Sequence, residues 1–332
     1  MTYWEQRFLN LKEDGLHTAR SSFEDLTSIY TYSLNKYENQ IARFIQRYAN
    51  SNNLSLADAK RQLSARELKD FKITLKQYIK LAQQKNLSPK QIKLLDNASL
   101  RARLSRLEEL WIHTSQFVEI LAQEQHTNIS DALNKVYNST YYEAAYLTQS
   151  LQGKYQTFRQ IPKKAIQEAI NTPWNNQDFS QRIWDQRDKL ITKLQQEITR
   201  SFIAQEPTER ITERISQACD VQMSNARRLV ETEVAYVQEL ALNNTFKELN
   251  VKQYQILATL DKHTSSVCRH LDKHIIDRTD FKPGVTAPPF HPYCRSTMIP
   301  YVPLTQRASR PDTKTEYVPD ISYEEWQATY LK

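Results

Sequence analysis

Residues 100–121 read LRARLSRLEELWIHTSQFVEIL, a stretch in which large apolar side chains recur every three or four positions. The recurring positions are Leu100, Leu104, Leu107, Trp111, Thr114, Val118 and Leu121. Alternation by four and three residues places these side chains along one stripe of a helix, as in a heptad repeat. The pattern predicts a long helix whose stripe is buried in a helical hairpin or bundle. Self-association of this helix as a coiled coil is the alternative.

Helical signals continue on both sides of this stretch. Apolar positions from Tyr3 to Asn50 recur at helical intervals, and a break is predicted near Gly15. Ser88-Pro89 marks a helix start with proline at the first helical position. Residues 127–130 predict the start of another helix, which ends near Gly153. Residues 1–155 are therefore predicted to form a helical N-terminal domain.

The distribution of glycine and proline separates the front of the chain from its end. The 332 residues include three glycines, whereas roughly 7% of an average protein is glycine. Glycine-rich phosphate loops and dinucleotide-binding turns need several closely spaced glycines, so the composition excludes both kinds of site. Eight of the 12 prolines lie between Pro283 and Pro319, which predicts an irregular, stiffened segment there.

Overall composition places the chain among soluble globular proteins. Apolar residues make up 39% and charged residues 25%, and the formal net charge is +7. No apolar run approaches the ~18 residues expected of a membrane-spanning helix. The start of the sequence lacks the basic-then-apolar order of a secretory leader. With three cysteines, we expect a reducing compartment and free or metal-bound thiols.

The second half combines helices with a small sheet. Helices are predicted to begin near Pro162, Ser180, Thr208 and Ser224. Short apolar, β-branched runs at 254–260 and 296–302 predict strands. Beyond Pro303 the chain is polar and broken by proline, although residues 323–326 are suited to a short docked helix.

The predicted fold is mainly α and consists of three parts. Residues 1–155 form the N-terminal helical domain. Residues 156–303 form a helical region with a small α+β C-terminal module. Residues 304–332 form an extended tail.

A row of lysines is the first candidate binding feature. Residues 51–100 hold ten Lys or Arg and four acidic residues, and Lys69, Lys72, Lys76 and Lys80 share one helical face. Like charges four residues apart cost a few tenths of a kcal/mol per pair. An anionic partner, either a nucleic acid or an acidic protein surface, would remove this repulsion, and binding to nucleic acid would also release counterions. A solvated face beside a buried apolar stripe is the alternative interpretation.

A group of cysteines and histidines is the second candidate. Cys268, His270, His291 and Cys294 offer two sulfurs and two nitrogens, a donor set that suits tetrahedral zinc. A structural zinc would stabilise a segment with little apolar core of its own. In the alternative interpretation, His291 is a hydrogen-bonded residue in a proline-rich turn and both thiols are merely buried.

Catalysis by the same residues is a further alternative. Cys268 with His263, His270 or His291 would form a nucleophile–base pair. Asp261, His263 and His291 would form a metal-dependent hydrolytic centre. Neither set has a supporting local motif, so we expect no catalytic residues in this chain.

Four blocks between about Trp174 and Val302 form a recognisable pattern. They are FSQRIW at 179–184, ARRLVETE at 226–233, ATLDKHT at 258–264 and PPFHPYCR at 288–295. The last block is the most specific, because paired prolines before His-Pro-x-Cys-Arg rarely arise by chance. Together the blocks resemble the phage minor head proteins of the Mu F-like head morphogenesis family.

The chain departs from the pattern of this family at two positions. Related proteins commonly contain Thr-Cys-x-x-Cys and end the last block in Cys-Arg-Cys, but here one cysteine of each motif is replaced by Ser265 or Ser296. The paired loss suggests the hypothesis that the two positions face each other. A four-cysteine metal site is therefore weakened, whereas a mixed Cys/His site is retained.

The resemblance implies a virion protein present in few copies. Such a protein associates with the portal during procapsid assembly in the host cytoplasm, lies inside the head and contacts the packaged double-stranded DNA. The implied partners are the portal protein, the DNA and, in addition, scaffolding or major capsid protein, with no membrane. Ejection with the genome is a further implied role. The leading alternative function is a genome-delivered enzyme, a nuclease or transferase, that uses the C-terminal His/Cys group. A third interpretation is a purely structural protein that does not contact DNA.

Overall fold

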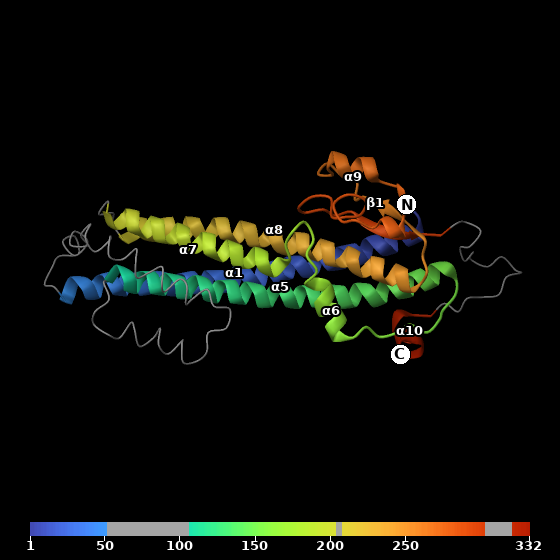
Figure 1. Ribbon diagram of the computed structural model, residues 1–332, viewed down its shortest axis with the longest axis horizontal. Helices are drawn as coiled ribbons and strands as arrows, with labels where there is room; N and C mark the ends of the chain where they lie inside the picture. Colours follow the sequence, from blue (N-terminus) through green and yellow to red (C-terminus); the bar gives the residue numbers. More distant parts are fainter. Residues whose placement is uncertain (52–105, 204–207, 303–320) are drawn as a thin grey trace, which may run out of the picture. The chain divides into compact units, whose positions relative to one another are not determined.

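The computed structural model describes residues 1–51, 106–203, 208–302 and 321–332 (Figure 1). The elements are α1 (Tyr3–Ser51), α5 (Arg106–Gln152), α6 (Lys163–Ile170), α7 (Phe179–Ile203), α8 (Thr208–Glu248), β1 (Gln253–Leu257), α9 (Ser266–Leu271), β2 (Ile275–Asp277), the 3-10 helix η1 (Arg278–Asp280), β3 (Thr297–Tyr301) and α10 (Tyr323–Tyr330). The fold is mainly α, with a small sheet near the C-terminal end, as predicted. Among the described helices, none is both long and apolar enough to cross a membrane.

The predicted break at Gly15 is wrong, because α1 runs through it without interruption. A Cβ atom at position 15 would lie 2.6–2.7 Å from the side chain of Gln238 in α8. The amide nitrogen of Gln238 donates a hydrogen bond to the Leu11 carbonyl in α1, at 2.6 Å. Glycine at this position therefore allows a close approach between two helices and does not end one.

Two predicted helix starts are also wrong. Residues 127–130 lie inside α5, and Ser224 lies inside α8. In α5 the buried side chains of Ile129, Leu133 and Val136 continue the helical spacing through the expected start. Tertiary burial of such a face outweighs local capping signals, because most helical stability in proteins comes from packing.

The described chain divides into two compact units, each built from segments distant in sequence. Unit 1 comprises residues 1–25, 126–182 and 226–332, and unit 2 comprises 26–125 and 183–225. The predicted domains 1–155, 156–303 and 304–332 are continuous stretches of sequence, whereas each unit combines several separate segments. The domain boundaries therefore stay a prediction.

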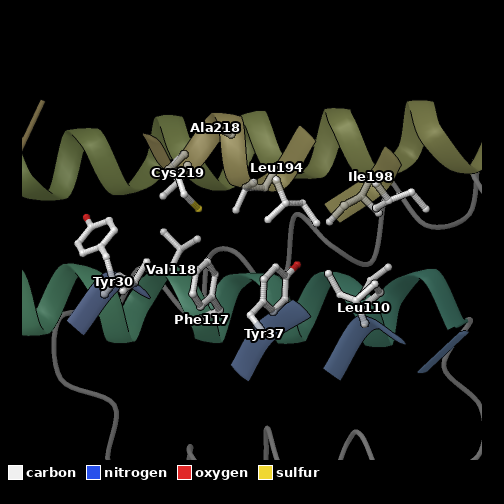
Figure 2. Packing of buried hydrophobic residues seen from close by; sticks show 14 residues of the cluster. Tyr30, Tyr37, Leu110, Phe117, Val118, Leu194, Ile198, Ala218 and Cys219 are labelled. Atoms are coloured by element: carbon white, nitrogen blue, oxygen red, sulfur yellow. The ribbon is translucent and has the colours of Figure 1, made fainter. Parts of the chain in front are cut away.

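Unit 2 has a core formed by α1, α5, α7 and α8 (Figure 2). Its buried members are Tyr30, Tyr37, Ile41, Leu110, Phe117, Val118, Leu121, Leu190, Leu194, Ile198, Ile211, Ile215, Ala218 and Cys219. The rings of Tyr37 and Phe117 stack with centroids 4.4 Å apart. In the described part of the heptad pattern, Thr114, Val118 and Leu121 are buried. This part of the predicted stripe is thus buried against other helices of the same chain, as in a bundle.

Unit 1 contains the sheet together with parts of α1, α5 and α8 and the short helices α6, α9 and α10. Phe8 of α1 meets Phe246 of α8 edge to face, at 6.4 Å between ring centroids. The Thr245 hydroxyl of α8 donates to the Tyr141 carbonyl of α5, at 2.9 Å. The sheet is antiparallel with strand order β2-β1-β3. β1 and β3 confirm the two predicted strands, with ends shifted by one to three residues.

A buried ion pair ties α1, α8 and β3 together in unit 1. Lys12 Nζ lies 2.9 Å from Glu239 Oε1, and the two side chains are 2% and 0% exposed. The other carboxylate oxygen of Glu239 accepts a hydrogen bond from the Met298 backbone N–H, at 3.0 Å. Burial raises the pKa of Glu239, an effect that Lys12 opposes. This pair fixes the position of β3, the strand that follows the cysteine- and histidine-containing turn.

Candidate functional site

The predicted DNA-binding residues and the predicted metal ligands fall in different parts of the chain. Lys69, Lys72, Lys76 and Lys80 lie outside the described residues, so the lysine face stays a prediction. Cys268, His270, His291 and Cys294 all lie in unit 1, on α9 and on the segment that leads into β3. In Figure 1 this region is orange, and α9 and β1 are labelled there.

The first half of the cysteine site is positioned by a helix cap. Ser265 is the N-cap of α9, and its hydroxyl accepts a hydrogen bond from the Cys268 backbone N–H at 3.2 Å. Serine is favoured at an N-cap because its side chain satisfies an otherwise unpaired helix N–H group. The Thr264 hydroxyl donates to the Thr259 carbonyl at 2.6 Å and closes the loop that precedes the helix. These contacts hold the Cys268 thiol in the first turn of α9.

The second half of the site is a proline-rich turn. The Pro288–Pro289 peptide bond is cis, and Tyr293 has a φ of 62°. The Cys294 N–H donates to the His291 carbonyl at 3.2 Å, which closes a tight turn between the two residues. β3 then begins at Thr297. The turn brings His291 and Cys294 to the face of α9 that carries Cys268.

Three of the four predicted ligands come together. The Cys268 sulfur lies 3.2 Å from His291 Nε2 and 3.7 Å from the Cys294 sulfur. All three ligand atoms lie within 4.8 Å of one another. Cys268 is 3% exposed and Cys294 is fully buried. With Ala258 and the partly buried Phe290, the cysteines form a small apolar cluster.

His270 does not join this group, which corrects the predicted set of four ligands. It lies in the last turn of α9, is exposed, and its ring contacts that of His274 at 5.4 Å between centroids. Two residues along a helix correspond to a rotation of about 200°, so Cys268 and His270 point to nearly opposite sides. The close Cys-x-His spacing in sequence therefore does not bring the two side chains together.

The proton on the His291 ring is fixed by a backbone contact. Its Nδ1 lies 2.8 Å from the Pro292 carbonyl oxygen, which can only accept a hydrogen bond. In the neutral ring Nδ1 therefore carries the proton, and the lone pair of Nε2 faces the sulfur of Cys268. The Ser265 hydroxyl lies 2.9 Å from the same Nε2.

The two thiols differ strongly in acidity. A hydrogen bond from Cys294, supported by Ser265, Ser296 and the charge of Arg295, lowers the pKa of Cys268 to about 6. The same contact with Cys268, together with burial, raises the pKa of Cys294. Cys268 is therefore the more acidic thiol of the two. Ser265 and Ser296 thus both act on the pKa of the same thiol.

An ion pair that the sequence analysis did not predict joins the loop before α9 to the turn that contains Cys294. Arg295 makes two contacts of 2.7 Å with the carboxylate of Asp261. The Arg295 guanidinium, helped by the His263 backbone N–H, holds the pKa of Asp261 well below its usual range. Asp261 is thus engaged with Arg295, and the described residues do not bring it into the metal-ligand group. Opposite charges 34 positions apart gave no local pattern from which this pair could be predicted.

A mixed-charge pocket of about 530 Å³ lies beside the cysteine site within unit 1. Its lining includes Arg20 from α1, Glu231 from α8, and His263, Ser265, His291 and Tyr293 from the loops. His291 therefore has two environments, because its Nε2 faces the sulfur of Cys268 and the residue also lines the pocket. The cysteine sulfurs do not line the pocket.

Comparison with known proteins identifies the region that contains this site. Residues 192–299 match the family model described as Phage Mu protein F like protein, which confirms the resemblance over this segment. The matched segment runs from α7 into β3 and contains Cys268, His291 and Cys294. The Mu F-like family suggests a phage head protein.

A curated relative is named for a different function. The NAD(+)–arginine ADP-ribosyltransferase EFV of Enterococcus faecalis (strain ATCC 700802 / V583) is 21% identical over 252 residues, which is 70% of this chain and 51% of that protein. The chain thus spans about half the length of the curated relative that it matches. No solved structure matches the chain significantly.

Proposed function

We propose that the chain is a phage minor head protein that associates with the portal during procapsid assembly and is incorporated inside the head. The match of residues 192–299 to the Mu F-like model is the observation that carries this proposal. The portal protein is the main proposed partner, and scaffolding or major capsid protein is a further one. The protein is proposed to lie in the virion, to pass through the host cytoplasm during assembly, and to leave with the genome on ejection.

The length of the two longest described helices is compatible with a role in assembly. α1 and α5 contain 49 and 47 residues, whereas the average helix of a globular protein has about 11–12. Helices of this length present long solvent-facing sides beside their buried stripes, and extended surfaces of this kind suit contacts with neighbouring subunits. Tyr32, Ile120 and Val221 in unit 2 are apolar and 57–71% exposed, and they are candidates for such contacts.

Contact with double-stranded DNA is the second component of the proposal. The net charge of +7 favours a polyanionic partner, and the net charge of residues 51–100 is +6 by sequence. Lys69, Lys72, Lys76 and Lys80 would neutralise backbone phosphates without reading bases. Binding of this kind is independent of base sequence, as is required of a protein that lies beside any packaged genome.

Replacing Lys72, Lys76 and Lys80 together by Gln is expected to weaken DNA binding and to flatten its dependence on salt. With each phosphate contact that is lost, fewer counterions are released on binding. The magnitude of the slope of log K against log salt concentration therefore falls by about 1 per contact. Fluorescence anisotropy with a double-stranded oligonucleotide, measured at several salt concentrations, gives both the affinity and the slope.

The matched control replaces Lys154, Lys163 and Lys252 by Gln. These three lysines are exposed, and their replacement removes the same net charge from other parts of the chain. The proposal expects this control to bind DNA nearly as the unmodified protein does. Equal losses in the two triple variants would contradict a localised lysine face and would indicate a general charge effect.

We propose no catalytic step for this chain. Two observations favour an enzyme: the similarity to the E. faecalis ADP-ribosyltransferase and the contact between Cys268 and His291. However, the Cys268 sulfur is packed against Cys294, is almost completely buried and does not line the neighbouring pocket. A nucleophile must meet its substrate, so this burial favours a structural role for the thiol pair.

A further inference from the structure

We propose that Cys268, His291 and Cys294 bind one zinc ion, with water at the fourth position, and that this ion joins α9 to the turn before β3. The inference is independent of the proposed role in the phage head, because it rests on the geometry of unit 1. The three residues supply two sulfurs and one imidazole nitrogen, a combination that binds zinc in preference to magnesium or calcium.

The distances fit a tetrahedral ion. With a Zn–S bond of about 2.3 Å, two sulfurs on one tetrahedral zinc lie about 3.8 Å apart, and the sulfurs of Cys268 and Cys294 are 3.7 Å apart. A sulfur and an imidazole nitrogen on the same ion lie about 3.5 Å apart, and the observed separation between Cys268 and His291 is 3.2 Å. The third pair, the Cys294 sulfur and the His291 ring nitrogen, lies within 4.8 Å, so metal binding requires these two atoms to approach each other by up to about 1 Å.

The orientation of His291 favours metal binding. Ligating histidines usually donate their second ring N–H to a carbonyl or carboxylate, which fixes the tautomer and directs the free nitrogen at the metal. Nδ1 of His291 makes such a contact with the Pro292 carbonyl, at 2.8 Å. The lone pair of Nε2 is therefore aimed at the sulfurs.

The surrounding fold gives the ion a structural role. The apolar cluster at this end of unit 1 consists of Ala258, Cys268 and Cys294, with Phe290 packed against it. So small a cluster buries little apolar area, and the free energy of metal binding would add to the folding stability of such a segment. The ion would link residues 26 positions apart and so close the loop between α9 and β3.

Ser265 identifies the fourth position. Its hydroxyl lies 2.9 Å from Nε2 of His291 and accepts a hydrogen bond from the Cys268 backbone N–H at 3.2 Å. A neutral hydroxyl is a poor zinc ligand, so Ser265 is placed to hydrogen-bond a zinc-bound water. A thiolate at this position would reach the same ion. We therefore expect the substitution Ser265→Cys to complete a site with four protein ligands.

The test measures zinc in the full chain, purified under reducing conditions from zinc-supplemented cells. Elemental analysis should find about one zinc per chain in the unmodified protein. Cys294→Ser and His291→Ala should each lose most of it. Cys219→Ser and His270→Ala are the controls and should retain zinc, because Cys219 lies in the core of unit 2 and His270 points away from the group. Ser265→Cys should raise the zinc affinity at least tenfold in a chelator competition.

Cobalt gives a second measurement that does not depend on the folding of any variant. Co²⁺ added to metal-depleted unmodified protein should produce the visible absorption of a tetrahedral ion, together with sulfur-to-metal charge transfer. Protein that is free of zinc after purification and gives no such spectrum would overturn the proposal. It would also be overturned by full zinc retention in Cys294→Ser, or by a Cys268–Cys294 disulfide in place of the metal under reducing conditions.

Discussion

Replacing Lys12 by Met is expected to destabilise unit 1 by about 3–5 kcal/mol. The substitution removes the partner of Glu239, whose carboxylate is completely buried. A buried charge without its partner must either remain ionised in an apolar environment or take up a proton, and both cost free energy. Met has nearly the length of the lysine stem, so the loss reflects charge more than packing. Urea unfolding, followed by circular dichroism, measures the change.

The double variant Lys12→Met, Glu239→Gln separates the charge effect from other causes. A glutamine oxygen can still accept the hydrogen bond from the Met298 N–H, which the glutamate accepts at 3.0 Å. Neutral pairs of similar volume are often as stable as the buried ion pairs they replace. We therefore expect the double variant to recover most of the lost stability. A loss below about 1 kcal/mol in Lys12→Met would show that the pair is not held buried as described.

Replacing Trp326 by Ala is expected to release α10, the short helix at the end of the chain. Trp326 is fully buried in unit 1, and loss of such a side chain costs about 3–5 kcal/mol. Its ring packs against those of Tyr146 and Phe158, at 6.1 Å between centroids in each case. Its Nε1–H also donates to the buried amide oxygen of Gln149, at 2.9 Å. An eight-residue helix without these contacts is too short to persist in water.

Hydrogen exchange measures this release directly. Amides of residues 323–330 should exchange nearly as fast as an unfolded peptide in Trp326→Ala, whereas amides in the core of unit 2 should keep their protection. Trp326→Phe is the matched control, because it retains an aromatic ring and removes the bond to Gln149. We expect an intermediate loss of about 1–2 kcal/mol for this control. Unchanged protection of α10 in Trp326→Ala would contradict the described docking.

Helices and strands were predicted well where burial has a regular period. The apolar spacing at 111–121 predicted a buried stripe, and Thr114, Val118 and Leu121 are buried in the core of unit 2. The runs at 254–260 and 296–302 predicted the paired strands β1 and β3. A regular repeat of apolar residues identifies the side chains that share one face of a helix or strand. It does not show which other elements that face contacts.

Helix ends were predicted less well, because capping residues and glycine have more than one use. Gly15 was expected to interrupt a helix, yet it accommodates the side chain of Gln238. Gly153, in contrast, has a φ of 69° directly after α5 and does mark the expected helix end. The two glycines differ in their tertiary neighbours, and these neighbours cannot be predicted from residues on the same helix.

The candidate metal site was predicted in part. Residue type identified Cys268, His291 and Cys294, but the direction of each side chain depends on α9 and on the turn at 288–294. His270 has the right chemistry and points away from the group. Ser265 and Ser296 were noted as departures from a family pattern, and their contacts with Cys268 became evident only in the structure. Donor type is therefore encoded locally, whereas convergence of the donors depends on the fold.

Localisation in an intact particle is the most direct test of the proposed function. We expect a reconstruction of the purified phage particle, calculated without imposed symmetry, to show a few copies inside the head beside the portal. Quantitative mass spectrometry of the same particles should give a correspondingly low copy number relative to the major capsid protein. Absence of the protein from purified particles, or its presence throughout the outer capsid lattice, would contradict the proposal that it is a portal-associated minor head protein.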